Sequence, residues 1–156
     1  MNKKLKILIA ISFVIYLFVL IYVTFLNRVS MHYASIWDYA RVHMNLIPGD
    51  SIKLYMKMFK NDTMRYIAVV NLGVNLFLLT PMSLFLMSLF KIMRKWYVLF
   101  STCLFVLIII EILQLLTMRG SFDVDDLILN MAGAVIGYFI WMIMSKSTRK
   151  DGANND

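Results

Sequence analysis

The chain has 156 residues, 61% of them hydrophobic, and its 16 Lys and Arg against 9 Asp and Glu give a formal net charge of +7. With a mean hydropathy of +0.74, this composition excludes an ordinary water-soluble domain of this length. The basic residues gather at the ends of apolar runs, so their charge indicates membrane topology, and we expect no nucleic-acid partner. The single cysteine, Cys103, excludes a disulfide framework.

Four apolar stretches are long enough to cross the ~30 Å hydrocarbon core of a bilayer as helices. They comprise residues 7–26, 67–90, 97–118 and 127–144. Backbone polar groups must be paired inside lipid, and these stretches lack strand-like alternation. The sequence therefore predicts an all-α integral membrane bundle of about four transmembrane helices within residues 1–145, followed by a cytoplasmic tail at 146–156.

Basic residues also predict the orientation, because positive charge is retained on the cytoplasmic side of a membrane. One side has nine in dense clusters: Lys3, Lys4, Lys6, Lys91, Arg94, Lys95, Lys146, Arg149 and Lys150. The other side has seven, more widely spread: Arg28, Arg41, Lys53, Lys57, Lys60, Arg65 and Arg119. We expect both termini to be cytoplasmic and the long loop at residues 27–66 to lie outside.

This outer loop contains an amphipathic segment. Apolar residues recur at helical spacing: Ile52, Tyr55, Met56 and Phe59. Lysines occupy the other side: Lys53, Lys57 and Lys60. With Asp50 or Ser51 as a cap, the pattern predicts a short helix lying on the outer interface. The alternative is an extension of the second span, because Asn61-Asp62 is only a weak break.

Polar side chains interrupt the outer halves of two spans. Asn71 and Asn75 are four residues apart in the second span, and Glu111 and Gln114 are three apart in the third, so each pair shares a helix face. Counting back from Met118 places Glu111 ~10 Å below the outer boundary. A carboxylate at that depth costs at least ~2.5 kcal/mol, so it should face the bundle, be protonated or meet a partner.

The turn before the fourth span contains Arg119 and three aspartates, Asp123, Asp125 and Asp126. The N-terminal N–H groups of a helix favour negative charge. We expect capping to account for one aspartate and not for all three.

A polar and glycine stripe continues along the fourth span. Asn130, Gly133 and Gly137 follow Asp126 at offsets of four, seven and eleven residues, within one helix face. Glycines on that face allow another helix to approach closely, and Asn130 can form a hydrogen bond across the contact. A purely structural role in holding helices together is the alternative to a binding role.

Polar residues from three spans thus agree in depth, which predicts an outer-leaflet pocket. Its candidate ligand-binding residues are Asn75, Glu111, Gln114, Arg119, Asp123, Asp126 and Asn130. The carboxylates could hold Ca²⁺ or Mg²⁺, but the aspartate spacing matches no calcium-binding loop, and we expect no metal or other cofactor. His32 and His43 are interpreted as surface loop residues.

Several of these strings resemble a known family. They are Asn45-Leu46-Ile47-Pro48, Asn75 with Pro81 six residues later, Glu111-x-x-Gln114, and Asp123-x-x-Asp126-x-x-x-Asn130-x-x-Gly133-x-x-x-Gly137. From about Asn45 to Tyr138 the chain resembles the VanZ-like membrane proteins. It departs from them at Gly49, where the family usually has Phe, and at Met82-Ser83, where an aromatic residue and Gly are usual. The resemblance implies a bacterial plasma-membrane protein associated with reduced susceptibility to teicoplanin, a glycopeptide antibiotic with a lipid tail.

Three functions follow as hypotheses. The first is a pocket that binds or shields an envelope lipid head group or a lipid-tailed antibiotic. The second is an intramembrane enzyme acting on a lipid-linked cell-wall intermediate, with Glu111 or an aspartate as general acid/base and Arg119 on phosphate, although no recognised catalytic motif is present. The third is an ion or proton path, for which a homodimer through Gly133 and Gly137 could build a larger bundle.

Overall fold

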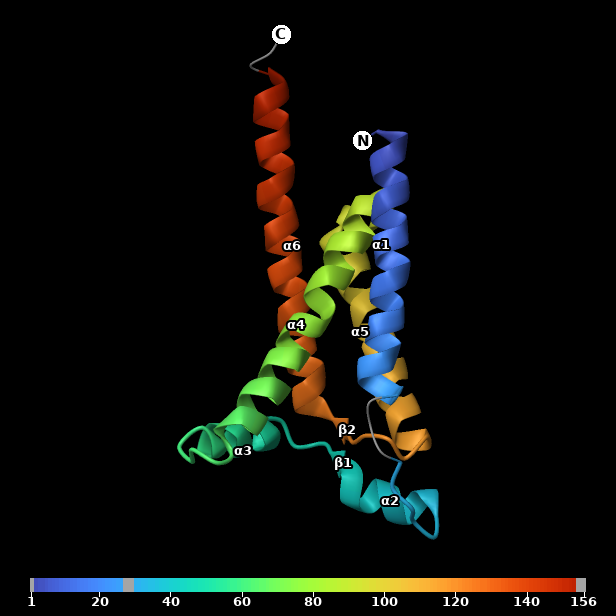
Figure 1. The fold of residues 1–156 in the computed structure, drawn as a ribbon, viewed down its shortest axis with the longest axis vertical. Coiled ribbons are helices and arrows are strands. Elements are labelled where there is room, and N and C mark those ends of the chain that lie inside the picture. Colours follow the sequence, from blue (N-terminus) through green and yellow to red (C-terminus); the bar gives the residue numbers. More distant parts are fainter. Residues whose placement is uncertain (1, 27–29, 154–156) are drawn as a thin grey trace.

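The computed structural model describes residues 2–26 and 30–153, and within them four long helices dominate the fold (Figure 1). These are α1 (Lys3–Ile21), extended by a π-helical turn at Tyr22–Leu26, then α4 (Arg65–Leu89), α5 (Trp96–Leu116) and α6 (Val124–Ala153). Each has a segment long and apolar enough to cross a membrane. The predicted all-α bundle of four spans is confirmed, and the chain is a multi-pass membrane protein. Arg28, which the sequence placed in the outer loop, lies outside the described residues.

The beginning of α1 and the end of α6 lie at the same end of the bundle, and the short elements cover the opposite end (Figure 1). These elements are α2 (Ile36–His43), β1 (Met44–Asn45), α3 (Asp50–Met58) and β2 (Phe122–Asp123). We refer to this end as the loop end. Helix α3 is the short helix predicted for the long loop. Turns at residues 59–64 separate it from α4, so the alternative of an extended second span is wrong.

Helices α4 and α6 cross in close contact at the glycine stripe. A Cβ atom added at Gly133 would lie 2.0 Å from the Leu76 carbonyl oxygen, and one at Gly137 would lie 2.5 Å from the Thr80 carbonyl oxygen. The Thr80 hydroxyl donates a hydrogen bond of 2.9 Å to the Gly133 carbonyl. The predicted close approach of a helix is therefore confirmed, and that helix is α4 of the same chain. This face is not available for the homodimer contact that the sequence suggested.

A small apolar core fills the space between α4, α5 and α6. Its buried members are Leu79, Met82, Leu86, Met87, Leu99, Cys103, Leu107 and Ala134. Helix α1 packs against α4, and the Tyr16 hydroxyl donates to the Leu78 carbonyl of α4. Large apolar side chains on the outside of α1 stay exposed, with Phe18 at 69%, as suits a helix whose solvent is lipid.

Candidate functional site

Asp123 anchors the long loop to the start of α6. Its carboxylate accepts hydrogen bonds from the Asn45 amide at 3.2 Å and from the Ser51 hydroxyl. It also accepts the backbone N–H of Asp125 at 2.8 Å, as an N-cap does at the beginning of a helix. The strands β1 and β2 pair in parallel beside these contacts, with Asn45 opposite Asp123. The role of Asp123 is thus to position the loop.

Asp125 caps a different helix from its own. Its side chain is fully buried, and its carboxylate accepts the backbone N–H groups of Gly49 at 2.6 Å and Ile52 at 3.1 Å, at the start of α3. Gly49 has a φ of +92°, a left-handed conformation that glycine adopts without strain. Capping thus explains two of the three aspartates, one more than the sequence predicted. Asp123 caps α6 and Asp125 caps α3.

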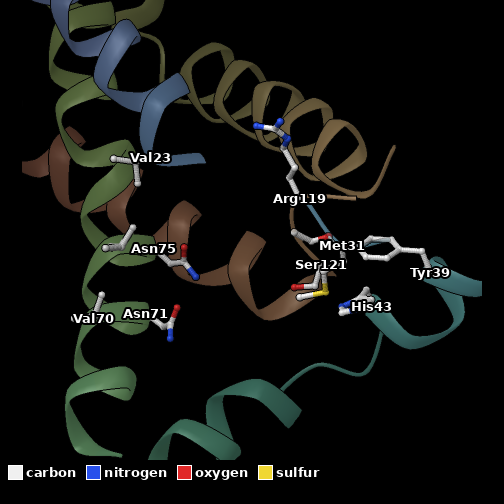
Figure 2. A pocket seen from close by; sticks show the side chains of 11 residues that line it. Val23, Met31, Tyr39, His43, Val70, Asn71, Asn75, Arg119 and Ser121 are labelled. Carbon is white, nitrogen blue, oxygen red and sulfur yellow. Dashed lines mark hydrogen bonds between the residues drawn. The ribbon is translucent and has the colours of Figure 1, made fainter. Parts of the chain in front are cut away.

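An open cavity of about 470 Å³ lies at the loop end (Figure 2). We call it the loop-side cavity. It is lined by Val23, Met31, Tyr39, His43, Val70, Asn71, Val74, Asn75, Arg119, Gly120 and Ser121. In Figure 2, Asn71 and Asn75 project from α4 on one side of it, and Arg119, Ser121 and His43 lie on the other. Its volume falls in the range of ~300–1,000 Å³ that is typical of ligand sites.

A second, much smaller space of about 20 Å³ adjoins the first, and we call it the polar chamber. It is lined by Val23, Thr24, Val74, Asn75, Leu78, Leu107, Ile110, Glu111, Gln114, Asp126 and Asn130. Val23, Val74 and Asn75 line both spaces, so they form the boundary between them. A space of this size accommodates about one water molecule.

Hydrogen bonds around the polar chamber connect different spans. The Asn75 amide of α4 donates to the Asp126 carboxylate of α6. The Gln114 amide of α5 donates at 3.1 Å to the Thr24 carbonyl, in the turn that ends the first span. These two bonds bring polar side chains from α4, α5 and α6 to the same place, as their common depth predicted.

Glu111 and Asn130 are two deeply buried polar groups of the chamber. Glu111 is 4% exposed, and its carboxylate accepts the backbone N–H of Asp123 at 3.3 Å. Asn130 is 2% exposed, and its N–H donates at 2.8 Å to the Asp126 carbonyl one turn earlier. The Asn130 side-chain oxygen is buried and has no hydrogen-bond partner within residues 2–26 and 30–153. The Asn130 amide therefore does not bridge to another helix, although the sequence suggested that it could.

Five of the seven candidate residues line the polar chamber, namely Asn75, Glu111, Gln114, Asp126 and Asn130. Arg119 lines the loop-side cavity instead, and its guanidinium donates at 3.1 Å to the Phe25 carbonyl. Asp123 lines neither space.

Helix α2 contributes side chains to the loop-side cavity that the sequence did not predict. Tyr39 is 1% exposed and donates at 2.8 Å to the Gly120 carbonyl, and His43 stacks on it with ring centroids 4.2 Å apart. Both side chains line the loop-side cavity, so the interpretation of His43 as a surface loop residue is wrong. The spacing of Ile36, Tyr39 and His43 after the capping Ser35 was a signal that could have found this helix.

In the part of the chain that the structure describes, no group of three or more His, Cys, Asp or Glu side chains is arranged to hold a metal ion. The absence of a cofactor stays a prediction.

A comparison with protein-family models matches the VanZ/LLP1 model to residues 13–145. The chain belongs to the VanZ/LLP1 family. The matched range contains every residue that lines the loop-side cavity or the polar chamber. Searches of curated proteins and of solved structures gave no match.

The strings that carried the resemblance all lie in one connected region of this VanZ/LLP1 protein. Asn45 anchors the long loop, Asn75 and the pair Glu111 and Gln114 line the polar chamber, and Gly133 begins the contact with α4. In this chain the motif residues therefore line the polar chamber and make the contacts that hold its walls in place, and Asn75 also lines the loop-side cavity.

Proposed function

We propose that this protein binds the polar head group of an envelope lipid, or a lipid-tailed glycopeptide of the teicoplanin type, at the outer leaflet of a bacterial plasma membrane. Binding there would shield the target or sequester the antibiotic and so reduce susceptibility. The observation that carries the proposal is the loop-side cavity of about 470 Å³, which adjoins a chamber lined by polar side chains from three spans. Buried polar groups in a membrane protein are costly unless they pair or receive something polar.

The charge distribution supports an outward-facing cavity. The basic clusters at the start of α1, at Lys91–Arg94 between α4 and α5, and at the end of α6 belong to the end opposite α2 and α3. Retention of positive charge in the cytoplasm would place the loop end, and with it the cavity, on the outer side.

The lining of the loop-side cavity suits an amphiphile with a charged head. Arg119 offers a guanidinium for phosphate or carboxylate, and Asn71 and His43 offer further hydrogen-bonding groups. Apolar neighbours such as Val70 and Val74 complete a surface that is partly polar and partly apolar, as ligand sites usually are.

The proposal predicts that Glu111→Ala abolishes protection against teicoplanin, because it removes a carboxyl group from the polar chamber. Cells that express equal membrane levels of the wild type and the variant are compared with an empty vector for teicoplanin and vancomycin susceptibility. We expect wild type to protect against teicoplanin more than against vancomycin, and the variant to resemble the vector.

Asp62→Ala is the matched control, because it removes a carboxylate whose side chain is 90% exposed and lies outside both spaces. It should protect like the wild type. Equal protection by Glu111→Ala would remove the chamber from the mechanism. Susceptibility of the wild type equal to that of the vector would remove the antibiotic role itself.

A second candidate function is favoured by the size of the polar chamber. A water-sized space bounded by the carboxyl groups of Glu111 and Asp126 is an arrangement that general acid/base catalysis could use on a lipid-linked cell-wall intermediate. The variant Glu111→Gln separates the two functions. In an enzyme it should retain ligand binding and lose turnover, whereas a binding protein has no turnover to lose.

A further inference from the structure

One buried hydrogen-bond acceptor of the polar chamber lacks a donor within the described residues. The amide groups of Asn75, Gln114 and Asn130 each donate an N–H to an oxygen of the protein. The Asn130 side-chain oxygen, in contrast, has no partner in the described part of the chain although the residue is 98% buried. A buried acceptor left without a donor has a desolvation cost that nothing offsets. An occupant that donates a hydrogen bond would recover that cost.

The carboxyl groups around the chamber favour a donor that is also a cation. Glu111 and Asp126 contribute carboxyl groups, and the eleven described lining residues include no Lys, Arg or His. In a poorly hydrated site, electrostatic attraction to a carboxylate is much stronger than in water. A positively charged N–H donor therefore fits the chamber better than a neutral hydroxyl group does.

The size of the chamber restricts the cation further. About 20 Å³ matches one water molecule and hence an –NH₃⁺ group, which has a similar size. A trimethylammonium group is several times larger and has no N–H to donate. Arg119 lies in the adjoining loop-side cavity, where it could meet an anionic group of the same molecule.

We propose that the polar chamber binds the primary ammonium group of an amphiphile whose phosphate or carboxylate lies in the loop-side cavity near Arg119. The inference rests on the proposed function and names the chemical class of its ligand. Two sources share this chemistry, an aminophospholipid head group and an amine of a lipid-tailed glycopeptide.

A methylation series on the wild-type protein tests the proposal. Purified protein in detergent is titrated with four lipids of identical acyl chains, from phosphatidylethanolamine through its N-methyl and N,N-dimethyl forms to phosphatidylcholine, and binding is followed by native mass spectrometry. Affinity should fall with each methyl group, by at least about tenfold over the series. Equal affinity for the first and the last lipid, together with equal affinity for a glycopeptide before and after acetylation of its amine, would overturn the proposal.

Two glycopeptide samples distinguish the sources. Preference for phosphatidylethanolamine alone assigns the site to a lipid head group, and preference for the free-amine glycopeptide alone assigns it to the antibiotic; either result supports a primary ammonium ligand. The cell assay with Glu111→Ala is independent of this result. Loss of protection in cells without any ammonium preference would contradict the ligand class and leave the proposed function standing.

A matched pair of variants locates the preference. Asn130→Leu removes the acceptor at similar volume and should reduce the ethanolamine-to-choline affinity ratio to about 1. Asn61→Leu makes the same change at an exposed residue that lines neither space and whose side-chain oxygen accepts only the nearby Thr63 N–H in the structure. It should leave the ratio unchanged. An undiminished ratio in folded Asn130→Leu would contradict the proposal, and if that variant does not fold, the methylation series decides alone.

Discussion

Replacing Gly133 with alanine is expected to lower the free energy of unfolding by about 1–3 kcal/mol, as overpacking of a core does. The added methyl group would meet the Leu76 carbonyl oxygen at 2.0 Å, and backbone atoms cannot move aside as a flexible side chain can. Gly137→Ala should act in the same direction, since its methyl group would lie 2.5 Å from the Thr80 carbonyl oxygen. Thermal unfolding in detergent, followed by circular dichroism, should show a midpoint lower by about 2–4 °C for each kcal/mol.

Gly73→Ala provides the control for these variants. Gly73 also lies in a membrane-spanning helix, but a Cβ atom there would meet nothing within 4 Å. Alanine has the higher helix propensity, by about 1 kcal/mol, so its midpoint should be unchanged or raised. If Gly133→Ala unfolded at the same temperature as Gly73→Ala, the close contact between α4 and α6 would be wrong.

Val74→Trp is expected to remove protection against teicoplanin, because Val74 lines both the loop-side cavity and the polar chamber. An indole at this boundary would fill space that the ligand needs and separate the two parts of the site. We expect susceptibility equal to that of the empty vector, with the variant present in the membrane at the wild-type level. Susceptibility testing on matched expression strains measures this directly.

Val69→Trp makes the same change on the same helix without touching the site. Val69 is 48% exposed and lines neither space. An exposed apolar side chain on a spanning helix is compatible with tryptophan, so protection should persist. Wild-type protection by Val74→Trp would show that the two spaces do not form the functional site.

The four spans and most of the polar chamber could be predicted because both depend on local sequence. The length of an apolar run defines a span, and helical spacing with common depth brought Asn75, Glu111 and Asp126 to one place. Depth alone could not separate Asp123 from this group. Asp123 is close to Asp126 in sequence, yet its carboxylate accepts a hydrogen bond from Asn45 of the long loop. Asn45 is 78 residues away in sequence.

The arrangement of the loop end could not be predicted because it depends on contacts between distant segments. Asp125 caps α3 through Gly49, which is 76 residues distant, and a cap of this kind leaves no local pattern. The two-residue strands are too short to show alternation. Likewise, Gly133 indicated a close helix contact, but the sequence did not reveal whether α4 or a second copy would make it.

If the loop-side cavity faces outward and receives a ligand, Ser121 should be accessible from outside the cell and shielded when the ligand is bound. Ser121 lines this cavity, and the native Cys103 is fully buried, so Ser121→Cys adds one reactive thiol. Lys146→Cys, at the end of the fourth span, serves as the control for the opposite side. The account predicts that a membrane-impermeant maleimide labels Ser121→Cys in intact cells, more slowly with added teicoplanin, and labels Lys146→Cys only after permeabilisation. Labelling of Ser121→Cys only after permeabilisation would contradict it.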